Sequence, residues 1–106
     1  MFAICEYSYM HVISEKALRP FWQKHTDSEG PMRLWLKIVE RATWRHFADV
    51  RQSFNSADVY GIYTIFDIKG NEYRIVTAIH YNRQKVFIRY VFTHREYDRW
   101  NKGGSL

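Results

Sequence analysis

"YTIFDIKGNEYRIVTAIHYNRQKVFIRYVF", residues 63–92, determines the fold expected for this chain. Three segments of it are rich in β-branched and aromatic residues and alternate with a period of two, as strands do. "KGN" (69–71) and "NRQ" (82–84) separate these segments at hairpin length. The pattern predicts an antiparallel meander of three strands, which the short segment "HVIS" (11–14) joins as a further strand.

Helices are expected ahead of the meander. Residues 17–25 keep helical spacing after Ser14, a fair N-cap, and Pro20 within them predicts a kink or a late start. A second and clearer helix begins at Asp27 or Ser28. Because an amphipathic helix and a half-buried sheet each need a partner, the two helices must cover one face of the sheet, which is an α+β fold. The following stretch, up to the first strand of the meander, is expected to form a short helical turn and a connection.

Length and composition describe a single folded domain. A chain of 106 residues can bury one core, and 46% apolar with 18% aromatic residues excludes a disordered chain. No apolar run approaches the roughly 18 residues of a membrane span. The single cysteine, Cys5, cannot form an internal disulfide, which favours a reducing cytoplasm.

The net charge of +5 is unevenly distributed. Residues 1–60 hold eight Lys and Arg against seven Asp and Glu, whereas residues 61–106 hold eight against four. A basic C-terminal half attracts polyanions such as RNA. A basic bias that serves solubility accounts for the same charge equally well.

The sequence contains no recognisable motif for binding a metal or a cofactor. The five histidines have no close partner at a ligand spacing, and the phosphate-binding patterns GxGxxG and GxxxxGK are absent. We therefore expect no metal and no cofactor.

Cations and one imidazole are carried instead by consecutive strands and by the residues that follow them. These residues are Lys69, Asn71, Arg74, Lys85, Arg89, His94 and Tyr97. Alternation places Arg74 on the face of Val76, and Arg89 on the face of Phe87 and Val91. If these faces coincide, the two arginines approach each other and provide a site for an anion. Alternatively, each arginine extends separately to water at the sheet edge.

Metal-free RNA cleavage requires groups of this kind. The ribose 2′-OH attacks the adjacent phosphorus, so a base must take its proton and an acid must protonate the leaving 5′-oxygen. His94 could transfer a proton, and Tyr97 could orient the base or donate a proton. Arg74 and Arg89 would suit the phosphorane, because a planar guanidinium matches phosphate oxygens. If the chain turns helical after Thr93, His94 and Tyr97 are at positions i and i+3.

Four stretches resemble the HigB-type toxins of bacterial toxin–antitoxin pairs, which belong to the RelE-like endoribonuclease superfamily. They are "MHVISEKALRPFWQKH", "FADVRQSF", "FDIKGNEYRIV" and "KVFIRYVFTHREYD", between Met10 and about Trp100. The combination of "GNEYR" with "THREYD" is specific, although neither is so alone. The resemblance implies two N-terminal helices on an antiparallel sheet and metal-independent cleavage of mRNA, typically in the ribosomal A site. It also implies a cognate helix-turn-helix antitoxin of the HigA type.

Carried over residue by residue, the resemblance points to one set of site residues. It implies catalytic roles for Arg74, Arg89, His94 and Tyr97, and RNA contacts by Lys69, Asn71, Lys85 and Asp98. Family members commonly begin near the position of Met10, so residues 1–9 are expected to be an extension of a single toxin domain, 1–106. Residues 101–106 are expected to be a disordered tail.

Two other functions remain open. A non-catalytic RNA-binding module would stack bases on exposed Tyr73, Tyr81 or Tyr90 beside Lys and Arg. A basic protein-interaction domain would bind RNA only incidentally. Cleavage of RNA distinguishes a nuclease from both.

Overall fold

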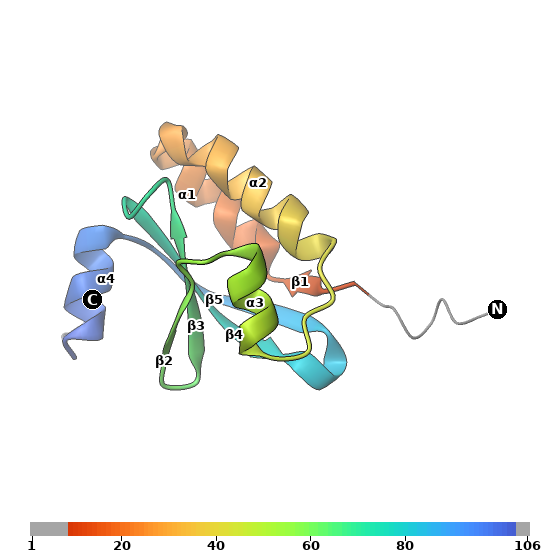
Figure 1. Cartoon of the computed structure of the whole chain (residues 1–106). Helices are drawn as coiled ribbons and strands as arrows, with labels where there is room; N and C mark the ends of the chain where they lie inside the picture. Colours follow the sequence, from red (N-terminus) through yellow and green to blue (C-terminus); the bar gives the residue numbers. More distant parts are fainter. Residues whose placement is uncertain (1–8, 104–106) are drawn as a thin grey trace.

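One mixed sheet of five strands organises the protein, in the order β1-β5-β4-β3-β2 (Figure 1). The computed structural model describes residues 9–103. Antiparallel pairing joins β3 (Tyr63–Ile68), β4 (Tyr73–His80) and β5 (Lys85–Thr93), which confirms the predicted meander.

The two edge strands differ from the expectation. β1 (His11–Ile13) joins the sheet as predicted but runs parallel to β5, so the sheet is mixed. β2 (Asp58–Tyr60) was expected to be mainly connection, yet it pairs antiparallel with β3. A hairpin turn with Gly61 at φ 60° joins β2 to β3, and a positive φ of this kind is what two-residue hairpins require.

Helices cover both faces of the sheet (Figure 1). α1 (Leu18–Lys24) and α2 (Glu29–Glu40) pack on one face, as predicted, together with the short helix α3 (Phe47–Ser53). α4 (His94–Asn101) packs on the opposite face. Within residues 9–103, none of these helices has the length and hydropathy needed to cross a membrane.

Ser28 occupies the N-cap position of α2, as predicted, but neither Ser14 nor Ser28 makes a capping hydrogen bond with its side chain. Ser14 has a left-handed backbone (φ 70°) and makes no capping bond, and it precedes a 3-10 turn at Glu15–Ala17. α1 therefore starts late, at Leu18, so Pro20 falls in its first turn, where a missing N–H costs little. Ser28 stands at the start of α2, but its hydroxyl donates to the carbonyl of His25 (2.6 Å) and does not cap the helix.

The main core lies between the sheet and α1, α2 and α3. Phe66 of β3 is fully buried at its centre. Its ring lies 5.3 Å from Trp35 of α2, 6.0 Å from Trp44 and 5.2 Å from Phe54, measured between centroids. Aromatic pairs at these separations add to the stabilisation that burial provides.

A smaller apolar cluster lies on the opposite face, beneath α4. Its buried residues come from three neighbouring strands, and α4 and β3 add partly buried rings over them: Ile65, Val76 and Phe92, with Tyr63, Tyr97 and Trp100. This contact fixes α4 to the sheet. The helix includes Asn101, the first residue of the expected tail, whereas residues 104–106 and 1–8 lie outside the described residues.

We expect Phe66→Ala to lower the free energy of unfolding by about 3–5 kcal/mol, because it leaves a cavity between three aromatic rings. A loss of this size is a large part of the total stability of a small domain. Ile62→Ala, at a side chain 81% exposed, is the control and should change the stability by less than about 0.5 kcal/mol. Urea unfolding measures both, and equal losses would contradict this description of the core.

Candidate functional site

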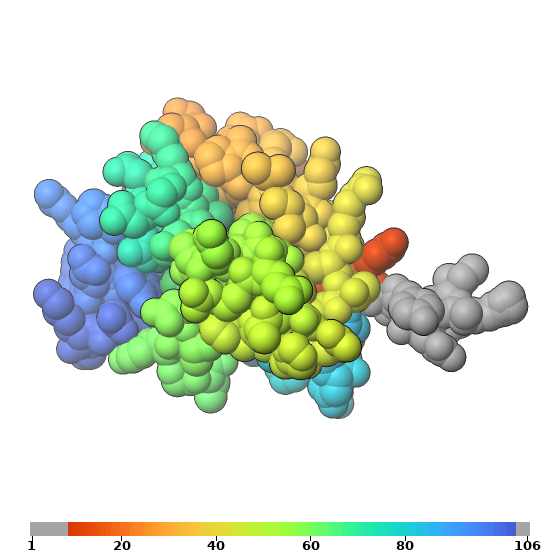
Figure 2. Space-filling view, in the orientation of Figure 1, coloured from red at the N-terminus to blue at the C-terminus, as the bar shows by residue number. Residues whose placement is uncertain are grey.

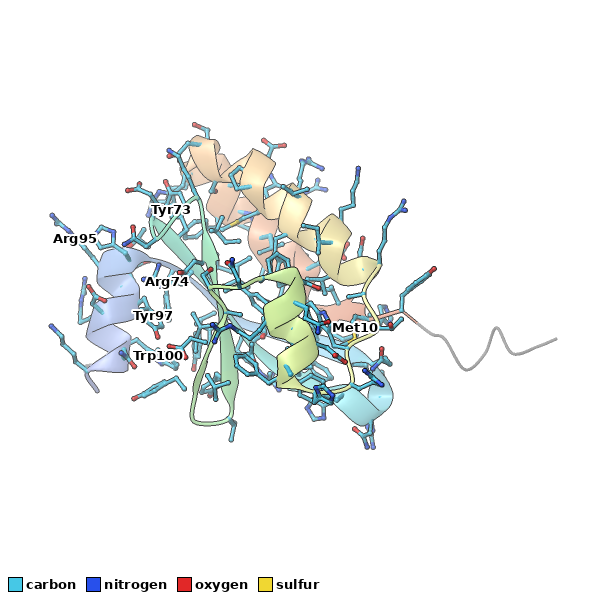
Figure 3. The ribbon with its side chains drawn as sticks, viewed as in Figure 1. Met10, Tyr73, Arg74, Arg95, Tyr97 and Trp100 are labelled. Carbon is cyan, nitrogen blue, oxygen red and sulfur yellow. The ribbon has the colours of Figure 1, made fainter. Side chains whose placement is uncertain are left out.

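A strand–helix corner, formed by Asn71, Arg74, His94 and Tyr97, lies where the β3–β4 turn meets the end of β5 and the start of α4 (Figure 3). The register of β4 on β5 creates it, since Tyr73 is opposite Thr93. The N–H of His94 then donates to the carbonyl of Glu72 in the turn (2.9 Å). In the space-filling view α4, in blue, lies directly beside this turn, in teal-green (Figure 2).

Arg74 is held in place by three neighbours. Its Nε lies 3.2 Å from Oδ1 of Asp67, on the neighbouring strand β3, and its Nη1 donates to the carbonyl of Asn71 (2.8 Å). Its Cζ is 5.1 Å from the ring centroid of Tyr97. Burial raises the pKa of Asp67, while the Arg74 charge acts in the opposite direction. The guanidinium is thus oriented before any ligand arrives.

Tyr97 connects the corner to the apolar cluster beneath α4. Its half-buried ring lies 6.0 Å from Trp100 and faces the Arg74 guanidinium. Burial raises the pKa of the Tyr97 phenol, and the Arg74 charge only partly opposes this. At neutral pH the group is therefore a neutral phenol that can donate a hydrogen bond.

His94 is the exposed first residue of α4. The helix begins with a capping box: the N–H of Glu96 donates to Oγ1 of Thr93 (3.3 Å), and the N–H of Thr93 donates to Oε1 of Glu96 (2.9 Å). The prediction that the chain turns helical after Thr93 is confirmed, so His94 and Tyr97 lie one turn apart. Arg95 projects away from the sheet (Figure 3), and Asp98 is exposed.

Lys69 belongs to the same turn, but its ammonium group forms an ion pair with Asp27. Its Nζ lies 2.7 Å from Oδ2 of Asp27, whose Oδ1 accepts a hydrogen bond from the Tyr73 hydroxyl (2.6 Å). The bonds from Lys69 and Tyr73 lower the pKa of Asp27. This network ties the β3–β4 turn to the segment between α1 and α2.

Lys85 and Arg89 are not brought to the corner. Lys85 starts β5, eight residues before Thr93, which is roughly 27 Å along a strand. Arg89 lies in a bulge, where the partner of β4 changes from Tyr90 to Ile88, and its Cζ is 5.3 Å from the Phe87 ring.

Of the two alternatives left open for Arg74 and Arg89, the structure has the separate arrangement. The bulge interrupts the alternation of β5, so Phe87 and Val91 lie on opposite faces: Val91 packs on the main core, while Phe87 is paired with Ala78. Arg74 is opposite Phe92 and bound to Asp67, and Arg89 lies farther along β5 on Phe87. No anion site between two arginines results.

The stacking surface considered for an RNA-binding module is also reduced. Tyr73 is buried, with 7% of its surface exposed, and Tyr81 is half-buried. Only Tyr90 of the three considered is exposed, at 40%.

Two partners of the corner were missed by the sequence analysis. Asp67 could have been found, because a hairpin that pairs Ile68 with Tyr73 necessarily places Asp67 opposite Arg74. Nothing in the sequence indicates Asp27 as a partner of Tyr73, since the two residues are 46 positions apart.

The corner is distinct from a groove of about 720 Å³ that lies between the end of α2, α3 and the β4–β5 turn, because no corner residue lines that groove. Among residues 9–103, no three His, Cys, Asp or Glu side chains are grouped so that they could hold a metal ion. An open, charged surface suits a polymeric substrate better than a small molecule.

Comparison with known proteins gives a consistent family. Residues 28–100 match the family HigB_toxin, described as a RelE-like toxic component of a toxin–antitoxin system. The chain is similar to the mRNA interferase toxin HigB of Escherichia coli (strain K12), with 28% identity over 92 residues, 84% of this chain and 88% of the relative. The mRNA interferase HigB of Shigella flexneri has the same identity and coverage. That of Escherichia coli O6:H1 is 19% identical over 93 residues, 85% of this chain and 90% of the relative.

We expect Thr93→Ala to destabilise the protein by about 1 kcal/mol, because it removes the cap that starts α4. Thr43→Ala, at an exposed threonine in a loop, is the matched control and should have little effect. Chemical unfolding of both variants makes the comparison. If Thr93→Ala were as stable as Thr43→Ala, the capping box would not hold the helix.

The Tyr73–Asp27 bond predicts a dependence of stability on alkaline pH. The bond to Asp27 and burial raise the pKa of Tyr73 from 10.0 to about 12. A raised pKa means that the neutral phenol stabilises the fold below pH 10, and that this contribution is lost as the pH rises through about 12. The difference in unfolding free energy between wild type and Tyr73→Phe should be constant up to about pH 10 and shrink above it. A difference that stays constant up to pH 12 would refute the bond.

Proposed function

Because the chain belongs to the HigB toxin family of RelE-like toxic components of toxin–antitoxin systems, we propose that it is the toxin of such a pair and cleaves mRNA as an endoribonuclease. Relatives of similar length that are named mRNA interferases support this activity. The observation in this chain that carries the proposal is the corner itself, where a fixed guanidinium, a neutral phenol and an exposed imidazole come together.

The reaction uses the ribose 2′-OH as its nucleophile. A base removes the 2′-OH proton as the oxygen attacks the adjacent phosphorus, and an acid protonates the departing 5′-oxygen. The products are a 2′,3′-cyclic phosphate and a 5′-hydroxyl. The protein must move two protons and stabilise the additional negative charge of the phosphorane.

Arg74 is suited to stabilise the phosphorane. Its Nε and Nη1 are taken by Asp67 and the Asn71 carbonyl, whereas its Nη2 has no hydrogen-bond partner within the described part of the chain. The free Nη2 edge can donate to a phosphate oxygen. Since the other contacts already fix the group, little reorganisation accompanies the reaction.

His94 is the group that transfers protons in this proposal. Its imidazole is exposed at the start of α4, where a substrate on the open surface can reach it. Tyr97 remains a neutral phenol, so it orients the reacting groups or donates a proton and does not act as a phenolate base. Asn71 and Asp98, both exposed beside these groups, would contact the RNA, as would Lys69 if it exchanges Asp27 for a phosphate.

The proposal also includes the partners and place of action. A cognate antitoxin with a helix-turn-helix domain, of the HigA type, would neutralise the toxin. The ribosome would present the mRNA, in the cytoplasm. The toxin domain would be the whole chain, 1–106, with residues 1–9 as its N-terminal extension. No metal would be required, so chelation by EDTA should leave cleavage unchanged.

We expect His94→Ala and Tyr97→Phe each to reduce mRNA cleavage by roughly 10²–10⁴-fold, because each removes a group that acts on a proton in the transition state. Arg95→Ala, the neighbouring variant on α4 whose side chain projects away, should retain cleavage. The measurement is mRNA integrity after induced expression in bacteria, with thermal melting as the test of folding. Intact mRNA with wild-type protein, or equal cleavage by His94→Ala and Arg95→Ala, would contradict the proposal.

A further inference from the structure

A row of basic and aromatic side chains runs along β5, away from the corner and on the same face of the sheet. We call it the β5 strip: His11, His80, Lys85, Phe87, Arg89 and Tyr90. α4 covers this face only at the end of β5, while the β4–β5 turn lies at the other end of the sheet (Figure 1). The strip is therefore open to solvent: its two histidines, Arg89 and Tyr90 are exposed, and Lys85 and Phe87 are half-exposed.

The strand register builds the far end of the strip. Lys85 is paired with His11 across the parallel edge and with His80 across the antiparallel one, so three nitrogen-bearing side chains form a row. Phe87 follows on the same face. The His80 ring meets it edge-on, with centroids 5.0 Å apart, and the Arg89 guanidinium covers it at 5.3 Å.

The bulge in β5 builds the near end. Val76 is paired with Tyr90 and Thr77 with Ile88, which leaves Arg89 as the inserted, unpaired residue. Bulges of this kind re-aim side chains next to functional sites. Tyr90 stacks on Phe92 at 5.2 Å with an 11° angle between the rings, and Phe92 is the partner of Arg74. The strip is thus continuous with the corner.

The lysine and the arginine of the strip are uncompensated, whereas His11 lies in the field of Glu40 of α2. β1, β4 and β5 contain no Asp or Glu, and the acidic residues of the sheet are Asp58 and Asp67, on β2 and β3. Asp67 pairs with Arg74, and Asp27 pairs with Lys69. Within the described part of the chain, Lys85 and Arg89 form no ion pair, so their charges remain for an anionic partner.

We propose that the β5 strip binds the single-stranded RNA that flanks the cleaved phosphodiester, an inference that rests on the proposed function. Lys85 and Arg89 contact phosphates, and the exposed face of Arg89 over Phe87, together with Tyr90, stacks bases. The roughly 27 Å from Lys85 to Thr93 accommodates on the order of four nucleotides of an extended strand. Alternating cations and flat groups favour RNA over an acidic peptide, which offers charge but no bases to stack.

The test measures binding without cleavage. The probe is a fluorescent, fully 2′-O-methylated single-stranded RNA of about twelve nucleotides, titrated by fluorescence anisotropy over a range of salt concentrations. The double variant Lys85→Ala, Arg89→Ala should bind about tenfold more weakly at low salt. Its log–log salt slope should fall by about 1.4, since each phosphate contact on a single strand contributes about 0.7. Phe87→Leu should weaken binding without changing the slope, because stacking releases no ions.

A matched control removes the same charge elsewhere. Arg19→Ala, Lys24→Ala changes two exposed cations on α1, which packs on the opposite face of the sheet, and should leave the affinity near that of wild type. Thermal melting verifies that each variant is folded. With a trinucleotide probe, which spans the corner alone, the strip variant and wild type should bind equally.

Several outcomes would overturn the proposal. It fails if wild type does not bind the longer RNA, or if the strip and α1 double variants bind it equally. It also fails if the strip variant loses affinity for a polyglutamate peptide but not for RNA, which would assign the strip to an acidic protein. These results are separate from cleavage: intact mRNA in cells refutes the nuclease, whereas unchanged RNA binding by a cleaving enzyme refutes only the strip.

Discussion

The register of β4 on β5 is the constraint on which the rest of the structure depends. It places Tyr73 opposite Thr93, so the β3–β4 turn and the start of α4 become neighbours. A slip of one residue would exchange the faces of a strand and move Ile75 and Val76 into each other's environments. Both are fully buried, Ile75 in the main core and Val76 beneath α4. Apolar burial on two faces therefore specifies the register strongly, and the side chains of the corner take their positions from it.

The bulge in β5 allows one strand both to pack on the main core and to present a cation on the open face of the sheet. Before the bulge, Val86 and Ile88 face the main core, and after it Val91 does so. Without the inserted residue, strict alternation would turn either Val91 or the pair Val86 and Ile88 away from the core. Arg89 is the residue left over, and it is exposed on the open face. The same local irregularity preserves the core and supplies a free cation to the surface.

The basic side chains discussed above fall into two groups, those paired with a carboxylate and those without such a partner. Arg74 and Lys69 lie close to the corner and each has a carboxylate partner, which fixes their positions at the expense of net charge. Lys85 and Arg89 have no such partner within the described residues, so their positive charges add to the electrostatic potential of the surface and no ion pair fixes their positions. A fixed guanidinium suits a transition state of defined geometry, whereas free cations suit a polymer that must bind and leave. The positions of the carboxylates produce this division: Asp67 on β3 reaches Arg74, Asp27 between α1 and α2 reaches Lys69, and β1, β4 and β5 contain no acidic residue.

The sequence by itself determined the α+β class, the three-stranded meander, the two covering helices and the helical turn after Thr93. Local periodicity and hairpin length carry this information, because neighbours along the chain become neighbours in space. It also indicated Asn71, Arg74, His94 and Tyr97, through their position at a turn and a strand end. The pairing of Asp67 with Arg74 was implicit in the hairpin, although it was missed. Only the tertiary structure decided that Asp27 pairs with Lys69, and that Arg89 lies on Phe87 and not beside Arg74. Those two outcomes depend on a bulge and on a contact across 42 residues, neither of which a period along the chain can express.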